Sequence, residues 1–311
     1  MVSVTQTLSI GSESQHGKIK ALKAPLEEFN TTPVVFENED SGLKLAGIVY
    51  TPVNMATDSQ LPGLVVQGPM GATKEQTQSL YAQLMATKGY VTMVYDYSFI
   101  GASQGQPRGN EDPEVKASDI HSAVSFLATY PNVDADRLGA IGICGSGVYL
   151  QYEALREDRL KAIVSVNPFT VINTVETAPQ EEILKQKAKY DETGEATRLD
   201  LIEPGSEGAE YYFDYQRGAA VNRVEFVSWS QLDWQKFNPT ELAKGLTQPY
   251  LMVCGENAFT RPGAEVMFNN AVSADKQLII IPEARHFDLY DGEKYVPAVI
   301  EDITEFLASH V

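Results

Sequence analysis

Residues 142–147, Gly-Ile-Cys-Gly-Ser-Gly, constrain the fold of this 311-residue chain more than any other stretch. They lie between an expected buried strand at 137–143 and an expected helix that runs to about residue 155. Gly142 and Ser146 stand two positions before and after Cys144, where larger side chains would collide in a sharp strand-to-helix turn. The sequence therefore predicts a strand–turn–helix unit that raises Cys144 at its tip, which makes this thiol the first candidate for a nucleophile.

A cysteine at a strand end is often only a small buried core residue. Glycines at 142, 145 and 147 favour the catalytic interpretation, because an ordinary strand end has no packing use for three of them. The N terminus of the following helix carries partial positive charge, so we expect it to favour the thiolate form of Cys144.

The rest of the chain predicts an α/β fold, with a mostly parallel sheet covered by helices on both faces, because apolar runs alternate with amphipathic stretches after residue 55. Segments 32–39 and 43–53, joined by a turn at 40–42, predict an antiparallel hairpin at one sheet edge. Further strands are expected at 63–67, 90–95, 161–166, 250–254 and 278–281, and helices at 74–88, 112–130, 180–190, 264–272 and 296–311. We divide the chain into an N-terminal arm (1–30), a core (31–167 and 248–311) and a cap or lid insertion (168–247).

The charge of the chain limits its partners. The formal net charge of −18, from 42 acidic and 24 basic residues, argues against nucleic acid and anionic membranes, since the field would repel polyanions. No run reaches the length of a membrane helix, and two cysteines are too few for a disulfide framework. We therefore expect a cytoplasmic protein with a small-molecule substrate, and we leave a homodimer open.

A nucleophilic thiol needs a base, and the chain has only four histidines. His286 is the best candidate, because it follows an expected strand in a loop at the end of the sheet where ligands bind. Glu256, directly after the expected strand 250–254, is the candidate acid that would orient the imidazole. Asp288 and Asn167 are weaker substitutes for it.

The remaining candidates would bind the substrate. The N–H of Gly145 is the expected first donor to an oxyanion, and the glycine-rich loop at 67–73 would supply the second from Met70 or Gly71, since proline 69 has no N–H. Phe99, Tyr149 and Tyr212 could line an apolar acyl pocket, although such aromatics more often pack between lid and core. No metal or organic cofactor is implied.

Five segments carry a family resemblance: Gly-Pro-Met-Gly-Ala-Thr-Lys-Glu-Gln at 68–76, Gly-Gln-Pro-Arg-Gly-Asn-Glu-Asp-Pro at 105–113, the turn at 142–147, Gln-Arg-Gly at 216–218, and His-Phe-Asp-Leu-Tyr-Asp at 286–291. With them the chain resembles an α/β hydrolase of the dienelactone-hydrolase-like branch, which includes acetyl-xylan-esterase-like proteins and fungal polyketide transferases. The resemblance implies Cys144 as nucleophile and His286 as base. It departs at 257–259, where relatives often carry an acid and this chain has Asn-Ala-Phe.

These observations predict a cysteine-dependent acyl hydrolase that acts on a small ester, lactone or thioester. Two alternatives stay open. An acyltransferase would use the same site with an alcohol or amine in place of water. A member of the fold without turnover would bind a small ligand under the insertion.

Overall fold

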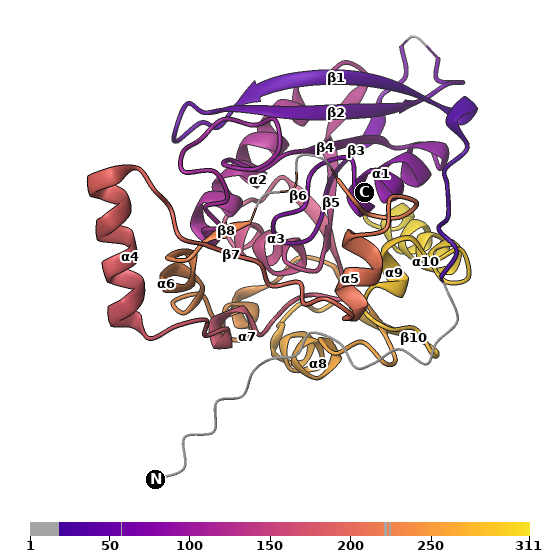
Figure 1. The fold of residues 1–311 in the computed structure, drawn as a ribbon. Coiled ribbons are helices and arrows are strands. Elements are labelled where there is room, and N and C mark those ends of the chain that lie inside the picture. Colours follow the sequence, from indigo (N-terminus) through magenta and orange to yellow (C-terminus); the bar gives the residue numbers. More distant parts are fainter. Residues whose placement is uncertain (1–18, 57, 221–222, 224) are drawn as a thin grey trace.

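An eight-stranded, mostly parallel sheet forms the centre of the molecule (Figure 1). The computed structural model describes residues 19–56, 58–220, 223 and 225–311. The strand order is β1-β2-β4-β3-β5-β6-β9-β10, with strands β1 (Phe29–Glu37), β2 (Lys44–Pro52), β3 (Leu61–Gln67), β4 (Val91–Tyr95), β5 (Val133–Ile143), β6 (Leu160–Val166), β9 (Tyr250–Gly255) and β10 (Lys276–Ile281).

The predicted edge hairpin is confirmed. β1 pairs antiparallel with β2 from Phe29↔Pro52 to Glu37↔Lys44, and β2 pairs antiparallel with β4. The turn is held by the side chain of Asn38, whose Oδ1 accepts hydrogen bonds from the N–H groups of Asp40 (3.0 Å) and Ser41 (2.7 Å). The other neighbouring strands pair in parallel, so their carboxyl ends meet at one edge of the sheet.

Helices cover both faces of this sheet and complete the predicted α/β-hydrolase fold (Figure 1). Helices α1 (Thr77–Thr87) and α10 (Val296–Ala308) pack together, whereas α2 (Pro113–Ala128) packs against α3 (Ser146–Ala154). The predicted start of α2 is confirmed in detail, because the Asp112 side chain accepts a hydrogen bond from the N–H of Glu114 at 3.0 Å. Helix α8 (Arg261–Asn270) follows β9.

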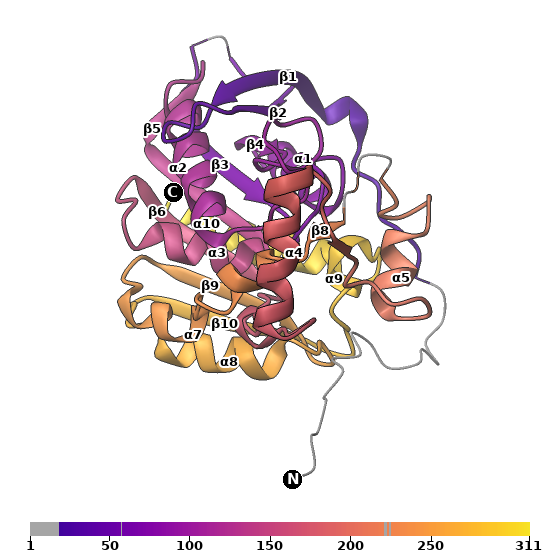
Figure 2. The same ribbon diagram turned by 60° about the vertical axis from the view of Figure 1, so that its left-hand side comes forward.

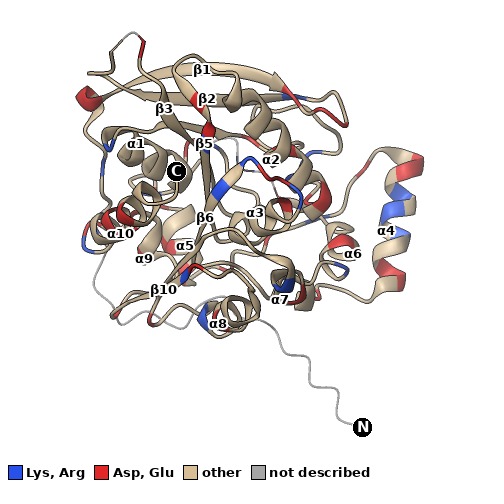
Figure 3. Cartoon of the chain, turned by 180° about the vertical axis from the view of Figure 1, so that it is seen from behind, with Lys and Arg blue, Asp and Glu red and all other residues tan. Residues whose placement is uncertain are grey.

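The segment between β6 and β9 contains short elements that do not join the large sheet. They are η2 (Ile172–Thr174), α4 (Gln180–Thr193), β7 (Arg198–Leu199), α5 (Glu207–Tyr212), β8 (Phe226–Val227), α6 (Ser230–Trp234), α7 (Pro239–Leu242) and η3 (Ala243–Gly245). Helix α4 stands at the side of the molecule, with acidic residues at both of its ends and lysines between them (Figure 3). Its one buried side chain, Ile183, packs with Val227 and Trp229. In contrast, α7 packs against α3 and α8 and so extends the helical layer of the core.

Asp291 is bound from two other parts of the chain, the segment after α5 and the N-terminal arm. Helix α5 lies beside α9 (Asp288–Asp291) in both ribbon views (Figures 1 and 2). Arg217, just after α5, binds Asp291 through a 2.6 Å ion pair in which both side chains are nearly buried. From the N-terminal arm, the N–H of Leu22 donates to the Asp291 carbonyl at 2.7 Å, whereas residues 1–18 lie outside the described residues.

None of the helices in the described ranges combines the length and the apolar character that crossing a membrane requires.

Candidate functional site

An apolar pocket lies at the carboxyl ends of the strands, between the core and the segment that joins β6 to β9. Core and cap both contribute to its walls. Its lining residues are Pro69, Met70, Gly71, Cys144, Phe169, Asp200, Leu201, Ile202, Tyr212, Arg223, Glu225, Phe226, Phe259, His286, Phe287 and Tyr290. Cys144, His286, Met70, Gly71 and Tyr212, which sequence reasoning selected as site residues, therefore meet in one cavity.

The predicted sharp turn positions Cys144 in this pocket. β5 ends at Ile143, α3 begins at Ser146, and Cys144 has a left-handed backbone with φ of 56°. A Cβ atom on Gly142 would lie 2.3 Å from the carbonyl oxygen of Ser146, so only glycine fits there. The structure therefore supports the steric argument for a small residue at position 142.

Two backbone N–H groups face the sulfur of Cys144, those of Gly145 and Met70, and both favour its thiolate. The two chain segments approach closely, since a Cβ atom on Gly145 would lie 2.9 Å from the Met70 nitrogen. The N–H of Gly71 instead faces the buried carboxylate of Glu111. Of the two alternatives for the second oxyanion donor, the geometry therefore favours Met70 over Gly71.

The protonation state of Cys144 differs from the expectation. Burial raises the pKa of the thiol to about 11, although Tyr290 and the N–H groups of Gly145 and Met70 pull it down. The expected thiolate is therefore not the resting form, because the loss of hydration in an apolar pocket outweighs the helix terminus and the hydrogen-bond donors.

His286 lies after β10 and is completely buried. Its Nδ1 is 3.0 Å from the hydroxyl oxygen of Thr260, and its Nε2 is 3.1 Å from the hydroxyl oxygen of Tyr290. The ring also packs against Phe259, with 4.5 Å between ring centroids. Burial lowers the pKa of His286 to about 3, so the imidazole is neutral at neutral pH.

The sulfur and the imidazole share the pocket, yet among the described residues no hydrogen bond joins Cys144 directly to His286. Tyr290 lies between them. Its hydroxyl group contacts Nε2 of His286, stabilises the Cys144 thiolate and hydrogen-bonds the hydroxyl group of Tyr212. The polar groups thus form a chain from Thr260 through His286 and Tyr290 to Cys144.

The three candidate partners of the imidazole are occupied elsewhere. Glu256 accepts a hydrogen bond from the N–H of Glu283 at 2.9 Å, and its side chain is exposed. Asp288 binds Arg285, with the closest N–O distance 2.9 Å. Asn167 donates to the backbone carbonyl of His286 at 2.8 Å, which positions the loop but not the ring. The structure thus corrects the expected acid, because the hydroxyl of Thr260 fills the position at Nδ1.

Of the three aromatic residues predicted to contact substrate, one lines the pocket and two do not. Tyr212 lines the pocket. Tyr149 is completely buried and donates its hydroxyl hydrogen to Glu111 at 3.0 Å, and Phe99 packs its ring over Gly105 in a loop away from the cavity. Both Tyr149 and Phe99 therefore have structural roles, as the packing alternative proposed.

Sequence reasoning missed Thr260 and Tyr290. Thr260 precedes Arg-Pro at the start of α8 and reads as a helix cap, but its hydroxyl makes no capping bond and contacts His286 instead. Tyr290 is four residues after His286, the spacing that brings two side chains together on a helix. This four-residue spacing was therefore the available signal.

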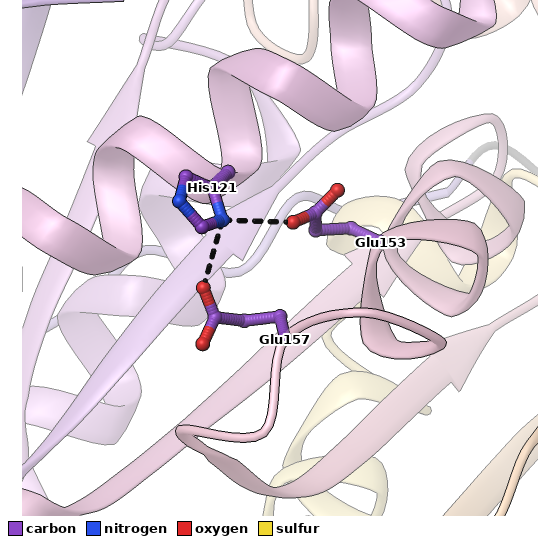
Figure 4. A group of neighbouring side chains, drawn as sticks. All are labelled: His121, Glu153 and Glu157. Carbon is purple, nitrogen blue, oxygen red and sulfur yellow. Dashed lines mark hydrogen bonds and ion pairs between the residues drawn. The ribbon is translucent and has the colours of Figure 1, made fainter. Parts of the chain in front are cut away.

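His121, Glu153 and Glu157 form a group whose ligand atoms are close enough to hold a metal ion (Figure 4). Nδ1 of His121 is 3.1 Å from Glu153 and 2.9 Å from Glu157. However, Glu153 already binds Arg156, and Glu157 binds Arg159. These pairs neutralise both carboxylates, so the group is read as an ion-pair network between α2 and the end of α3.

Comparisons with known proteins support the α/β-hydrolase fold. The model of the X-Pro dipeptidyl-peptidase (S15) family matches residues 41–288. The uncharacterized protein PA2218 of Pseudomonas aeruginosa is 32% identical over 89% of this chain and 80% of its own length. Its crystal structure superposes with a TM-score of 0.82, at 28% identity over 95% of this chain and 100% of the other.

Several fungal relatives have functional names, among them a thiohydrolase and a polyketide transferase. Thiohydrolase aneE of Aspergillus aculeatus is 32% identical over 46% of this chain and 43% of its own length. Polyketide transferase af380 of Aspergillus fumigatus is 24% identical over 80% of this chain and 90% of its own length. The polyketide-transferase part of the predicted resemblance is thus found among the relatives, whereas the dienelactone-hydrolase-like branch stays a prediction.

Proposed function

The chain belongs to the X-Pro dipeptidyl-peptidase (S15) family, and from that premise we propose that it is a cysteine-dependent acyl hydrolase acting on small thioesters or esters. The observation that carries the proposal is the position of Cys144 at the tip of the turn, inside an apolar pocket and against the N–H groups of Met70 and Gly145. Such donors stabilise the negative oxygen that forms when a nucleophile adds to a carbonyl.

The proposed reaction has two halves. The sulfur of Cys144 adds to the substrate carbonyl while its hydrogen passes to His286, which then gives it to the departing alcohol or thiol. The oxyanion accepts hydrogen bonds from Met70 and Gly145. The intermediate then expels an alcohol or a thiol and leaves an acyl group on the sulfur. In the second half, water adds to this acyl group, and His286 takes up the proton that the water loses. The sulfur–carbon bond then breaks, the acid leaves, and the proton passes from His286 to the sulfur.

The neutral site favours thioesters and esters over amides. An amine must receive a full proton before it leaves, so an amide depends most on the imidazolium that forms during the reaction, and the low pKa of His286, about 3, makes this imidazolium unfavourable. A thiol has an ordinary pKa of about 8.5, so its thiolate leaves without that help. Apolar walls from Phe169, Phe226 and Ile202 suit an uncharged acyl group.

Cys144→Ala tests the proposal. With a panel of acyl thioesters and nitrophenyl esters, we expect kcat/KM to fall at least about a thousandfold, because the covalent step is lost. Cys254→Ala is the matched control, since Cys254 is the other free cysteine and lies buried in β9 away from the pocket. Activity of Cys144→Ala within a few-fold of the parent protein would end the proposal.

An acyltransferase is the second candidate, favoured by the likeness to polyketide transferase af380. It would use the same acyl-cysteine, with an alcohol or amine in place of water. Adding such acceptors to a reaction that follows product formation separates the two functions. Hydrolysis predicts free acid whatever the acceptor concentration, whereas transfer predicts that the acceptor ester or amide replaces the acid.

A further inference from the structure

We propose that Tyr290 is a catalytic residue whose hydroxyl group carries the proton between the sulfur of Cys144 and Nε2 of His286. This inference rests on the proposed hydrolase function and adds a member to its site. It follows from the geometry of the pocket, where the hydroxyl group of Tyr290 contacts both reacting groups and no direct hydrogen bond joins those two described residues.

Tyr290 is held in position by its surroundings. It lies in the short helix α9 and is completely buried. Its backbone carbonyl accepts a 2.7 Å hydrogen bond from the hydroxyl group of Thr77. The ring of Tyr211 packs edge-on against it, with 5.0 Å between centroids and an angle of 87° between planes, and Phe287 packs at 4.7 Å. The hydroxyl group therefore stays directed at the sulfur and the imidazole.

The chemistry of the pocket requires such a link. Both ring nitrogens of His286 have hydroxyl partners, Thr260 and Tyr290, and within the described part of the chain no charged group hydrogen-bonds the ring. A thiol with a pKa of about 11 is ionised in only about one molecule in ten thousand at neutral pH. The reaction therefore proceeds from the neutral thiol, which must lose its proton as the sulfur–carbon bond forms.

The hydrogen bonds give a balanced route for that proton. The hydrogen of the thiol passes to the oxygen of Tyr290 while the phenol hydrogen passes to Nε2, and Nδ1 keeps its hydrogen toward Thr260. The sulfur–carbon bond forms, and the carbonyl electrons move to the oxyanion. On collapse, the bond to the leaving atom breaks, that atom takes a proton from Tyr290, and Nε2 returns one to the phenol. Water later adds to the acyl group and loses a proton through Tyr290 to Nε2. The sulfur–carbon bond then breaks, and the hydrogen returns through Tyr290 to the sulfur.

Tyr290→Phe removes only the hydroxyl group. We expect kcat/KM to fall about a hundredfold or more, the usual contribution of a positioned proton-transfer group. Tyr81→Phe is the matched control, because its buried hydroxyl donates to the backbone of Leu289 at 2.6 Å beside the same helix, and Tyr81 does not line the pocket. It should keep activity within a few-fold. Activity of Tyr290→Phe equal to or above that of the parent protein would overturn the inference.

Proton inventory gives a readout that does not depend on a variant. With kcat/KM measured for the parent protein in mixtures of H₂O and D₂O, a relay that moves two protons together predicts a curved dependence, and a single transfer predicts a straight line, which would refute the relay. Cys144→Ala keeps the two proposals separate. If it retains activity, the hydrolase function fails; if it is inactive and Tyr290→Phe is fully active, only the relay fails.

Discussion

Replacing Thr260 with aspartate should move the acid limb of the pH–activity profile upward. The hydroxyl oxygen of Thr260 lies 3.0 Å from Nδ1 of His286, and both side chains are buried. Burial lowers the pKa of His286 to about 3. A carboxylate at this distance from an imidazole raises its pKa by about 1–3 units. The pKa of His286 in the Thr260→Asp variant should therefore lie at roughly 4–6.

The sign follows from the role of the imidazole, which must be neutral to accept a proton. A higher pKa means that His286 is already protonated, and so inactive, at a higher pH as the solution is acidified. One pKa unit corresponds to about 1.4 kcal/mol, so the carboxylate favours the imidazolium by about 1.4–4 kcal/mol. The same interaction stabilises the imidazolium that forms during the reaction, so kcat/KM at neutral pH should rise.

The measurement is kcat/KM of a thioester from about pH 4 to pH 9, with tryptophan fluorescence to follow the fold at each pH. Thr260→Asn is the control, because it has nearly the shape of aspartate and no charge, and its acid limb should stay with that of the parent protein. The reasoning is refuted if the aspartate and asparagine variants titrate together. It is also refuted if the folded parent protein loses activity with an apparent pKa near 6.5.

Other perturbations test the same site. Iodoacetamide should alkylate Cys144 in the folded protein about a hundredfold more slowly at pH 8 than after unfolding, because burial raises the thiol pKa to about 11; Cys144→Ala measures the share of Cys254, and equal rates would contradict the burial argument. The pKa of His286 falls from 6.5 to about 3 on folding, so below pH 6.5 the unfolded state binds a proton that the folded state does not. The free energy of unfolding, measured with urea, should therefore decrease by up to about 5 kcal/mol between pH 6.5 and 3, and His286→Gln should lack this contribution; identical slopes would count against it. Gly142→Ala should lower the melting temperature and abolish activity, since its Cβ would lie 2.3 Å from the carbonyl oxygen of Ser146; a fully active variant would show that the turn can adapt.

The sequence predicts most of the core because its signals are local. The turn at 40–42, Asp112 as helix cap, and the small residues around Cys144 each specify a backbone conformation without knowledge of the rest of the chain. The cap is harder to predict. Its strands β7 and β8 contain two residues each, and α7 extends the core layer through contacts with α3 and α8 that no periodicity in four residues can reveal.

Site residues whose positions follow from local backbone geometry could be predicted from the sequence. Those whose positions depend on the packing of distant segments were missed. Cys144 and Gly145 follow from the turn, and His286 follows from its place after the last strand. Glu256 was expected at Nδ1 because a carboxylate is the usual partner, yet its exposed side chain binds the backbone of Glu283. The partner is Thr260, whose hydroxyl makes no capping bond at the start of α8 and contacts the ring instead.

Among the described residues no carboxylate hydrogen-bonds the ring of His286, and this feature and the neutrality of the Cys144 thiol have one physical cause. An ionised group in an apolar pocket costs several kcal/mol unless a partner of opposite charge is buried with it. The hydrogen-bonded side chains of this site are neutral and satisfy one another; they are Thr260, His286, Tyr290 and Cys144. This hydrogen-bonded series therefore carries no net charge in the resting protein. Charge then appears only during reaction, on the carbonyl oxygen facing Met70 and Gly145 and on the imidazole. A site of this kind predicts a rate that changes little between about pH 5 and pH 9, because neither of its reacting groups titrates in that range.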